Sequence, residues 1–208
     1  MKIYFDGCSY TEGKGYLGED YLEKRWSKLL CTKLGAEEYN ISESGGSNQR
    51  ILRNISTTHY NDTYDIAIIQ LTFPSRTEFY NGERFKSVNS HIVRKSDGSY
   101  FILQADARGL KKHNGSSSAY WKMYYERIYD DMYGETMEQM VYNSVKSIFK
   151  EKNTKLILLS CYENTKLNYD ITITPQTYPV VGNVNGKFNH HPSVDAQKLI
   201  ANDIYNLL

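Results

Sequence analysis

A serine near the start of the chain and a histidine near its end are the residues whose types and positions could do chemistry together. Ser9 lies in the segment FDGCSYTEG at residues 5–13, directly after the first apolar run. His191 lies in the segment NHHPS at residues 189–193, just before the last helical pattern. A serine hydroxyl becomes an effective nucleophile only when a neighbouring base takes its proton. The two segments therefore suggest a nucleophile and its general base, brought together by folding.

The elements that must position these two residues follow an alternation of strands and helices. The first five residues, a short run at 39–42 and two longer runs at 65–72 and 154–160 predict strands. The two longer runs are apolar on successive residues, which is typical of parallel strands covered on both faces. Helical spacing predicts helices over residues 21–34, over 119–150 with a break at Gly134, and over 193–208 with Val194, Leu199, Ile200 and Ile204 turned inward. A further helix, capped by Ser47 or Asn48, is expected to carry Ile51, Leu52 and Ile55 on its apolar side.

This alternation predicts the fold class. Strands separated by helices of about ten residues or more need crossover connections, which give a parallel sheet. We expect an α/β fold, a flavodoxin-like three-layer α/β/α sandwich, in a single domain spanning residues 1–208. Residues 73–118 interrupt the alternation and are expected to be an insertion, with a hairpin over 91–103 that turns at Asp97-Gly98 and roofs the active-site end. Open sheets of this kind bind ligands at the carboxyl ends of their strands.

Composition narrows the possible partners. The net charge of +1 over 208 residues, with no basic stripe, argues against nucleic acid and against a membrane surface. No secretory segment is visible, and no stretch reaches the roughly 20 apolar residues of a membrane span, so a cytoplasmic location is expected. Cys8, Cys31 and Cys161 lack CxxC spacing, which favours a reducing compartment over disulfides or zinc. No metal or other cofactor is expected, and the oligomeric state is not indicated.

Three segments resemble the sequence blocks of the SGNH (GDSL-like) hydrolases. GCSYT at residues 7–11 looks like the block that carries the nucleophilic serine, with cysteine in place of aspartate. NISESGGSN at residues 40–48 is similar to the block whose glycine amide serves the oxyanion hole, and HPS at 191–193 resembles the block that carries the catalytic histidine. The resemblance covers the chain apart from the insertion. It implies that Ser9 is the nucleophile, that His191 is the general base, and that Gly46 contributes to the oxyanion hole.

One departure from the family pattern concerns the oxyanion hole. The family's third block supplies an asparagine, whereas QLTFPSR at residues 70–76 contains none. Asn48, Thr72 and Arg76 are the candidate replacement donors. An arginine would make charge-assisted bonds, which suit an anion or a substrate that bears a carboxylate.

A second departure concerns the third member of the triad. The family's aspartate, three residues before the histidine, is replaced here by Phe188. Glu163, just after the strand at 154–160, and Asp6 are the candidate replacements. A serine–histidine pair can also work without a third member, although its imidazole is then less well oriented.

The function predicted from these residues is hydrolysis of a small acyl ester, and the resemblance implies an esterase or O-deacetylase with a carbohydrate or lipid substrate. Acyl transfer by the same site is one alternative, because its first half-reaction is identical. A binding or structural protein that kept the fold and lost the chemistry is another, because the family's asparagine and aspartate are missing. Cys8 as a rival nucleophile and a metal site at His190 and His191 are weaker interpretations, since adjacent side chains point apart.

Overall fold

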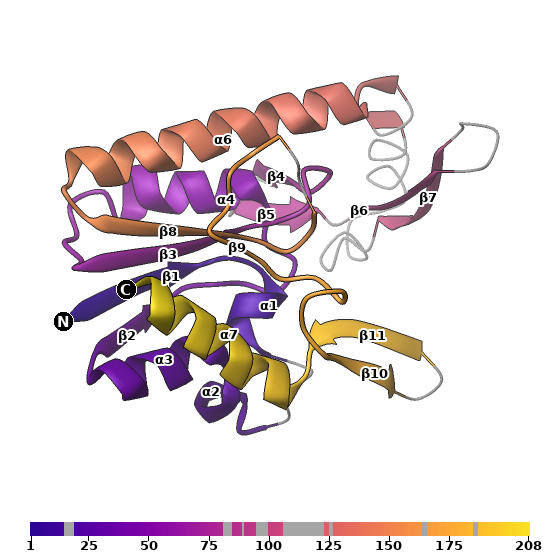
Figure 1. Ribbon diagram of the computed structural model, residues 1–208. Helices are drawn as coiled ribbons and strands as arrows, with labels where there is room; N and C mark the ends of the chain where they lie inside the picture. The colour runs from indigo at the N-terminus through magenta and orange to yellow at the C-terminus, as the bar shows by residue number, and fades with distance from the viewer. Residues whose placement is uncertain are drawn as a thin grey trace.

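The protein is a three-layer α/β/α sandwich, as the sequence predicts. We describe it from a computed structural model, covering residues 1–14, 19–80, 85–88, 90–94, 100–105, 123–124, 127–163, 166–184 and 187–208. Its main sheet contains, in spatial order, β2 (Glu37–Asn40), β1 (Lys2–Asp6), β3 (Ile66–Leu71), β8 (Lys155–Ser160) and β9 (Ile171–Thr172), and these strands pair in parallel (Figure 1). This is the order of flavodoxin-like sheets, in which ligands bind where the winding reverses, between β1 and β3.

Helices cover both faces of the sheet. The helical segments are α1 (Ser9–Glu12), α2 (Tyr21–Lys24), α3 (Trp26–Leu34), α4 (Asn48–Arg53), the π-helical segment η1 (Asn54–Thr58), α6 (Asp131–Glu151) and α7 (Val194–Leu207). Figure 1 shows α3 and α7 against one face, and α4 and α6 against the other. None of the helices in the described part of the chain is long and apolar enough to cross a membrane.

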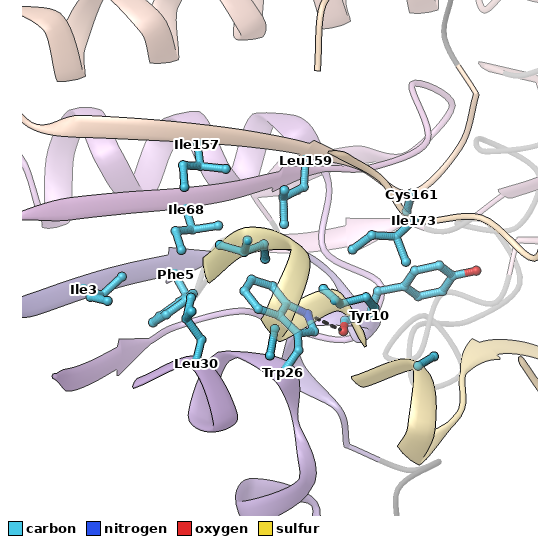
Figure 2. Close-up of a cluster of buried hydrophobic side chains, with 14 of the residues drawn as sticks. Ile3, Phe5, Tyr10, Trp26, Leu30, Ile68, Ile157, Leu159, Cys161 and Ile173 are labelled. Carbon is cyan, nitrogen blue, oxygen red and sulfur yellow. Dashed lines mark hydrogen bonds between the residues drawn. The ribbon is translucent and has the colours of Figure 1, made fainter. Parts of the chain in front are cut away.

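The central strand β1 contributes to a hydrophobic core on each side of the sheet. Ile3 and Phe5 pack with Trp26 and Leu30 on the α3–α7 side (Figure 2). Tyr4, between them in sequence, belongs to the core on the α4–α6 side. This division follows from the alternation of side chains along a strand. Because both faces are covered, the buried strand β3 is apolar at nearly every position, which is the pattern that identified it in the sequence.

Three antiparallel hairpins lie outside the main sheet in the described part of the chain. They are β4 (Thr77–Tyr80) with β5 (Phe85–Val88), β6 (Ser90–Arg94) with β7 (Tyr100–Ala105), and β10 (Val180–Val184) with β11 (Lys187–Pro192). The hairpin expected over residues 91–103 is confirmed as β6–β7, while its turn at 97–98 lies outside the described residues, and its function as a roof stays a prediction. The hairpin β10–β11 was not expected from the sequence, and it carries His191.

Two helices differ from their predicted bounds. The helix expected over 21–34 is divided at Arg25, whose backbone is extended. The helix expected from 119 instead has its regular part from Asp131 onward, where the Asp130 side chain accepts a hydrogen bond from the backbone N–H of Tyr133. Gly134 does not break this helix. Its missing Cβ makes room for the ring of Tyr129, which such an atom would approach within 2.9 Å.

The final helix is correctly located, but its inward face differs from the prediction. Ile200 and Ile204 are buried as expected, whereas Val194 and Leu199 are 40% and 46% exposed. Small and polar side chains occupy their expected places in the interface, where Ala196, Gln197 and Ala201 are buried. The prediction counted only large apolar residues, so it assigned the wrong residues to the buried face of this helix.

Candidate functional site

Folding brings Ser9 and His191 into hydrogen-bond contact, as the sequence predicts. Ser9 opens α1 directly after β1, and His191 lies in β11, 182 residues further along the chain. The Oγ atom of Ser9 is 2.8 Å from the Nε2 atom of His191. This distance lies within the range in which a general base can take a proton from a nucleophile.

Asn189 fixes which nitrogen of His191 faces the serine. The Asn189 Oδ1 atom lies 2.7 Å from His191 Nδ1 and 3.0 Å from the His191 backbone nitrogen. A backbone N–H can only donate, so the amide atom that meets it must be the oxygen. That oxygen can only accept, so Nδ1 carries the ring proton in the neutral imidazole. The lone pair of Nε2 is therefore directed at the hydroxyl of Ser9.

The neighbourhood of His191 favours a neutral imidazole. The ring packs edge-on against Tyr10, with centroids 5.1 Å apart, and the Tyr10 hydroxyl donates to the carbonyl of His190 at 3.1 Å. These contacts anchor β11 to α1 and partly bury the ring. Burial lowers the pKa of His191 below its usual value of 6.5, and the positive charge of Arg76 acts in the same direction. The group is then unprotonated near neutral pH, as a general base must be.

The two acids considered as third members of the triad occupy other positions. Asp6 is fully buried, and its carboxylate accepts from Arg50 at 2.7 Å, from Asn54 at 3.0 Å and from the backbone of Gly7 at 2.8 Å. Glu163 lines a cavity beside Pro74. The partner of His191 Nδ1 is instead Asn189.

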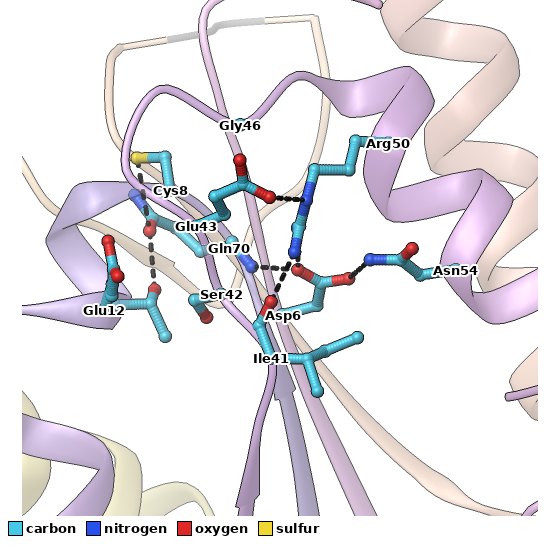
Figure 3. A network of polar contacts seen from close by, with 12 residues as sticks. Asp6, Cys8, Glu12, Ile41, Ser42, Glu43, Gly46, Arg50, Asn54 and Gln70 are labelled. Carbon is cyan, nitrogen blue, oxygen red and sulfur yellow. Dashed lines mark hydrogen bonds and ion pairs between the residues drawn. The ribbon is translucent and has the colours of Figure 1, made fainter. Parts of the chain in front are cut away.

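The cluster around Asp6 holds two loops together (Figure 3). Arg50 donates to Asp6 at the end of β1, to Glu43 at 2.8 Å, and to the carbonyl of Ile41 at 2.5 Å. The guanidinium thus connects β1 to the loop that follows β2. Each oxygen of the Asp6 carboxylate is occupied, because Asn54 and the Tyr4 hydroxyl share the second one. This arrangement gives Asp6 a structural role in place of the catalytic one considered above.

The lack of space for a side chain explains the glycines of both loops. A Cβ atom at Gly7 would lie 2.8 Å from the Thr11 hydroxyl, and one at Gly46 would lie 2.9 Å from the carbonyl of Glu43 and 3.3 Å from that of Gly7. The N–H of Gly46 donates to the Glu43 carbonyl at 2.8 Å, so it is already engaged, contrary to its expected role in the oxyanion hole. The backbone N–H of Ser9, by contrast, has no acceptor among the described residues, and it is one of the free donors at the start of α1.

The loop after β3 is fixed by Asn48 and supports Arg76. The Asn48 amide accepts from the N–H of Thr72 at 2.7 Å and donates to its carbonyl at 2.9 Å. The fully buried Thr72 hydroxyl accepts from Arg76 Nη1 at 2.5 Å, and the same nitrogen is 3.5 Å from the carbonyl of Gly46. Thr72 therefore positions Arg76, and its own N–H is not free to bind an oxyanion. Asn48 retains one amide hydrogen beyond the bond to Thr72.

The weaker interpretations lose support from the geometry. Cys8 is fully buried, and its thiol faces the side-chain oxygen of Gln70 at 3.6 Å (Figure 3). The imidazole of His191 pairs with Ser9 instead. His190 is exposed, next to a His191 that is turned inward. Within the described ranges, no group of three histidine, cysteine, aspartate or glutamate side chains is placed to hold a metal ion.

Sequence reasoning missed Asn189, although two signals pointed to it. Asn185-Gly186 is a dipeptide typical of hairpin turns, and it lies between the segments that form β10 and β11. Residues two apart on a strand share a face, so a strand ending near Pro192 would have placed Asn189 beside His191.

Known structures resemble this chain, although no family model and no curated protein matches its sequence. TesA has a TM-score of 0.50 and 13% identity, over 99% of this chain and 97% of that chain. A carbohydrate esterase, whose active site is described as having divergent catalytic and non-catalytic binding functions, has a TM-score of 0.53 and 14% identity, over 99% of this chain and 64% of that chain.

A lipolytic protein of the G-D-S-L family from Desulfitobacterium hafniense is also similar, with a TM-score of 0.40 and 16% identity over 100% of this chain and 99% of that chain. At such identities the likeness bears on the fold, and the TesA and carbohydrate esterase structures carry that argument. The sheet order and these two likenesses agree with the fold that the sequence blocks implied. The chain has the α/β sandwich fold of the SGNH (GDSL-like) hydrolases.

Proposed function

We propose that the protein is an ester hydrolase that uses Ser9 as its nucleophile and His191 as its general base. The observation that carries this proposal is the 2.8 Å contact between Ser9 Oγ and the lone-pair nitrogen of His191. The depressed pKa of His191 keeps the base unprotonated at neutral pH. The esterases with the same fold support the same class of reaction.

The reaction follows from the orientation of the imidazole. As Ser9 Oγ attacks the acyl carbon, its proton passes to His191 Nε2 and the carbonyl oxygen becomes an oxyanion. The imidazolium then returns the proton to the departing alcohol, which leaves an acyl ester on Ser9. Water attacks this ester, again giving a proton to Nε2. The imidazolium returns that proton to Ser9 Oγ as the acyl–oxygen bond breaks, and the carboxylic acid is released.

Three groups support the charges that develop during these steps. The free N–H of Ser9 and the remaining amide hydrogen of Asn48 are the donors we assign to the oxyanion. Asn189 stabilises the imidazolium through its Nδ1–H. An amide oxygen carries no full negative charge, so it attracts the imidazolium less strongly than a carboxylate would. We therefore expect a slower enzyme than one with a complete acidic triad.

The substrate we propose is a small acyl ester, on a glycan or another small molecule. The carbohydrate esterase of the same fold supports a glycan ester, and two aromatic side chains follow the carboxyl ends of β3 and β8 at the same edge of the sheet as Ser9. Phe73, two residues after β3, and Tyr162, two residues after β8, stack with ring centroids 5.6 Å apart. The free thiols of Cys8, Cys31 and Cys161 are compatible with action in the reducing cytoplasm.

Ester hydrolysis by matched variants tests the proposal. We would measure release of p-nitrophenol from p-nitrophenyl acetate by the parent protein, Ser9→Ala and His191→Ala, with the surface variant Ser144→Ala as control. We expect the parent and the control to release p-nitrophenol, and we expect Ser9→Ala and His191→Ala to lose this activity. A folded but inactive parent would favour a binding protein.

Acyl transfer is separated from hydrolysis by adding an acceptor. The same assay would be run with and without a sugar, and acylated sugar and free acetate would be quantified. Hydrolysis predicts acetate as the product in both cases. Accumulation of acylated sugar at the expense of acetate would assign the protein as an acyltransferase.

A further inference from the structure

Arg76 is a cation at the catalytic edge of the sheet whose charge is not balanced by a neighbouring acid. It is partly buried, and the carboxylates of the described residues do not form an ion pair with it. Acids on the surrounding segments already have other partners, and Glu78, two residues further along the chain, pairs with Arg53 at 2.7 Å. Asp6 and Glu43 pair with Arg50, and Glu12 accepts from the backbone of Ser44 at 2.6 Å.

The guanidinium of Arg76 is nevertheless held in a fixed position. One nitrogen, Nη1, donates to the buried Thr72 hydroxyl and lies near the Gly46 carbonyl, and the group lies 5.1 Å from the centre of the Phe73 ring. A guanidinium has five N–H donors. The bonds found among the described residues use only the Nη1 nitrogen, so Nε and Nη2 retain donors in a planar fork that matches a carboxylate.

Arg76 lies at the same edge of the sheet as the reacting groups, close to the loop that precedes Ser9. The Gly46 backbone that Nη1 approaches packs directly on Gly7, two residues before Ser9. The positive charge also reaches the imidazole of His191, where it opposes protonation. A partly buried charge without a counterion is costly to keep, and binding an anion removes that cost.

We propose that the ester hydrolysed at this site carries a carboxylate or a similar anionic group, which Arg76 binds through its free donors. The inference rests on the proposed function, because it names the class of ester that the Ser9–His191 pair acts on. The anion can belong to the acyl part or to the alcohol part of the ester, and the chemistry of recognition is the same in both cases. Arg76 is then the residue that determines substrate specificity.

Paired esters that differ in charge test the proposal. For the acyl part, p-nitrophenyl hemisuccinate is compared with p-nitrophenyl butyrate. For the alcohol part, para-acetoxybenzoate is compared with para-acetoxybenzamide. We expect the parent to prefer the charged member of at least one pair. Arg76→Ala should raise KM for that member about tenfold or more and should change the neutral member little, whereas Arg76→Lys should fall between them because it keeps the charge and loses the fork.

The control variant is Lys198→Ala, which removes an exposed cation on α7 and should leave both pairs unchanged. An equal fall in kcat for charged and neutral esters on Arg76→Ala would overturn the inference, because it would assign Arg76 to the oxyanion. The absence of any preference for charge in either pair would overturn it as well.

A binding measurement separates this inference from the proposed function. Succinate and para-hydroxybenzoate would be titrated by calorimetry into Ser9→Ala and into the double variant Ser9→Ala, Arg76→Ala. We expect binding of at least one anion in the first, weakened about tenfold or more in the second. Anion binding through Arg76 in a protein that cleaves no ester would refute the hydrolase and retain the anion site. Hydrolysis of neutral esters without anion binding would retain the hydrolase and refute the anion site.

Discussion

Asp6 and Ser9, three residues apart, belong to two polar clusters with opposite properties. The Asp6 cluster is charged and closed, because both carboxylate oxygens are bound and Arg50 donates to three acceptors. The Ser9 cluster consists of uncharged groups, and its neighbourhood leaves donors without acceptors in the described structure, on the Ser9 backbone and on Arg76. A saturated cluster can only hold the fold together. A cluster with unused hydrogen-bond donors can bind a ligand. The presence of such donors therefore distinguishes the candidate site from the structural cluster.

The largest expected difference between the two clusters comes from removing the nucleophile, which should abolish activity and hardly change stability. Ser9→Ala should lower kcat/KM by about 10⁴-fold or more, because what remains is binding and oxyanion stabilisation alone. Its free energy of unfolding should change by only about 1 kcal/mol, the net value of one hydrogen bond. Ester hydrolysis and urea unfolding of the same preparation measure the two effects. A Ser9→Ala variant that keeps more than a tenth of the parent activity would reverse the assignment.

Removal of Asp6 should produce the opposite result. Asp6→Ala leaves Arg50 without its buried partner, and breaking a buried ion pair in this way costs about 3–5 kcal/mol. Urea unfolding would measure the loss, with Asp195→Ala as a control because the Asp195 side chain is 84% exposed. If Asp6→Ala were as stable as that control but inactive, Asp6 would be catalytic after all.

Asn189 should have an intermediate effect on catalysis. Asn189→Ala removes the acceptor that fixes the His191 tautomer, so kcat/KM should fall about tenfold, the equivalent of one neutral hydrogen bond. Asn189→Asp keeps an acceptor and adds a negative charge, which favours the protonated imidazole and should raise the pKa seen in the pH profile. A merely structural role would lower activity in both variants without moving that pKa.

The smallest effect is the pH dependence of the parent. Because the pKa of folded His191 lies below 6.5, activity should be constant above that pH and should fall only in more acidic solution. The unfolded chain binds the proton more readily than the folded one, so this residue also makes the fold lose stability as the pH falls below 6.5. Rates measured from pH 5 to 8 at constant ionic strength would show this. A decline that begins above pH 7 would contradict a depressed pKa.

The parts of the molecule predicted correctly are those that depend on local pattern. Successive apolar residues identified β3 and β8, and the turn after β1 located Ser9. Hydrogen-bond saturation could not be predicted, because it depends on which groups meet in space. The partners of Asp6 come from β1, α4 and η1, and the carbonyl that engages the Gly46 amide comes from within its own loop.

The same reason explains the wrong candidates for the third member of the triad. Glu163 and Asp6 were considered because they are acids near strand ends, whereas the imidazole is positioned by an amide in a hairpin. Recognition of β10–β11 would have been needed first, and Gly182 and Asn183 give that segment the composition of a loop.

The most direct test of the account is to identify which atom reacts. The parent protein would be treated with a fluorophosphonate and digested, and the adduct would be located by mass spectrometry. We predict one adduct, on the Ser9 hydroxyl, that is lost in Ser9→Ala and strongly reduced in His191→Ala. An adduct on Cys8 or on any other residue, or a folded parent that stays unmodified, would contradict the account.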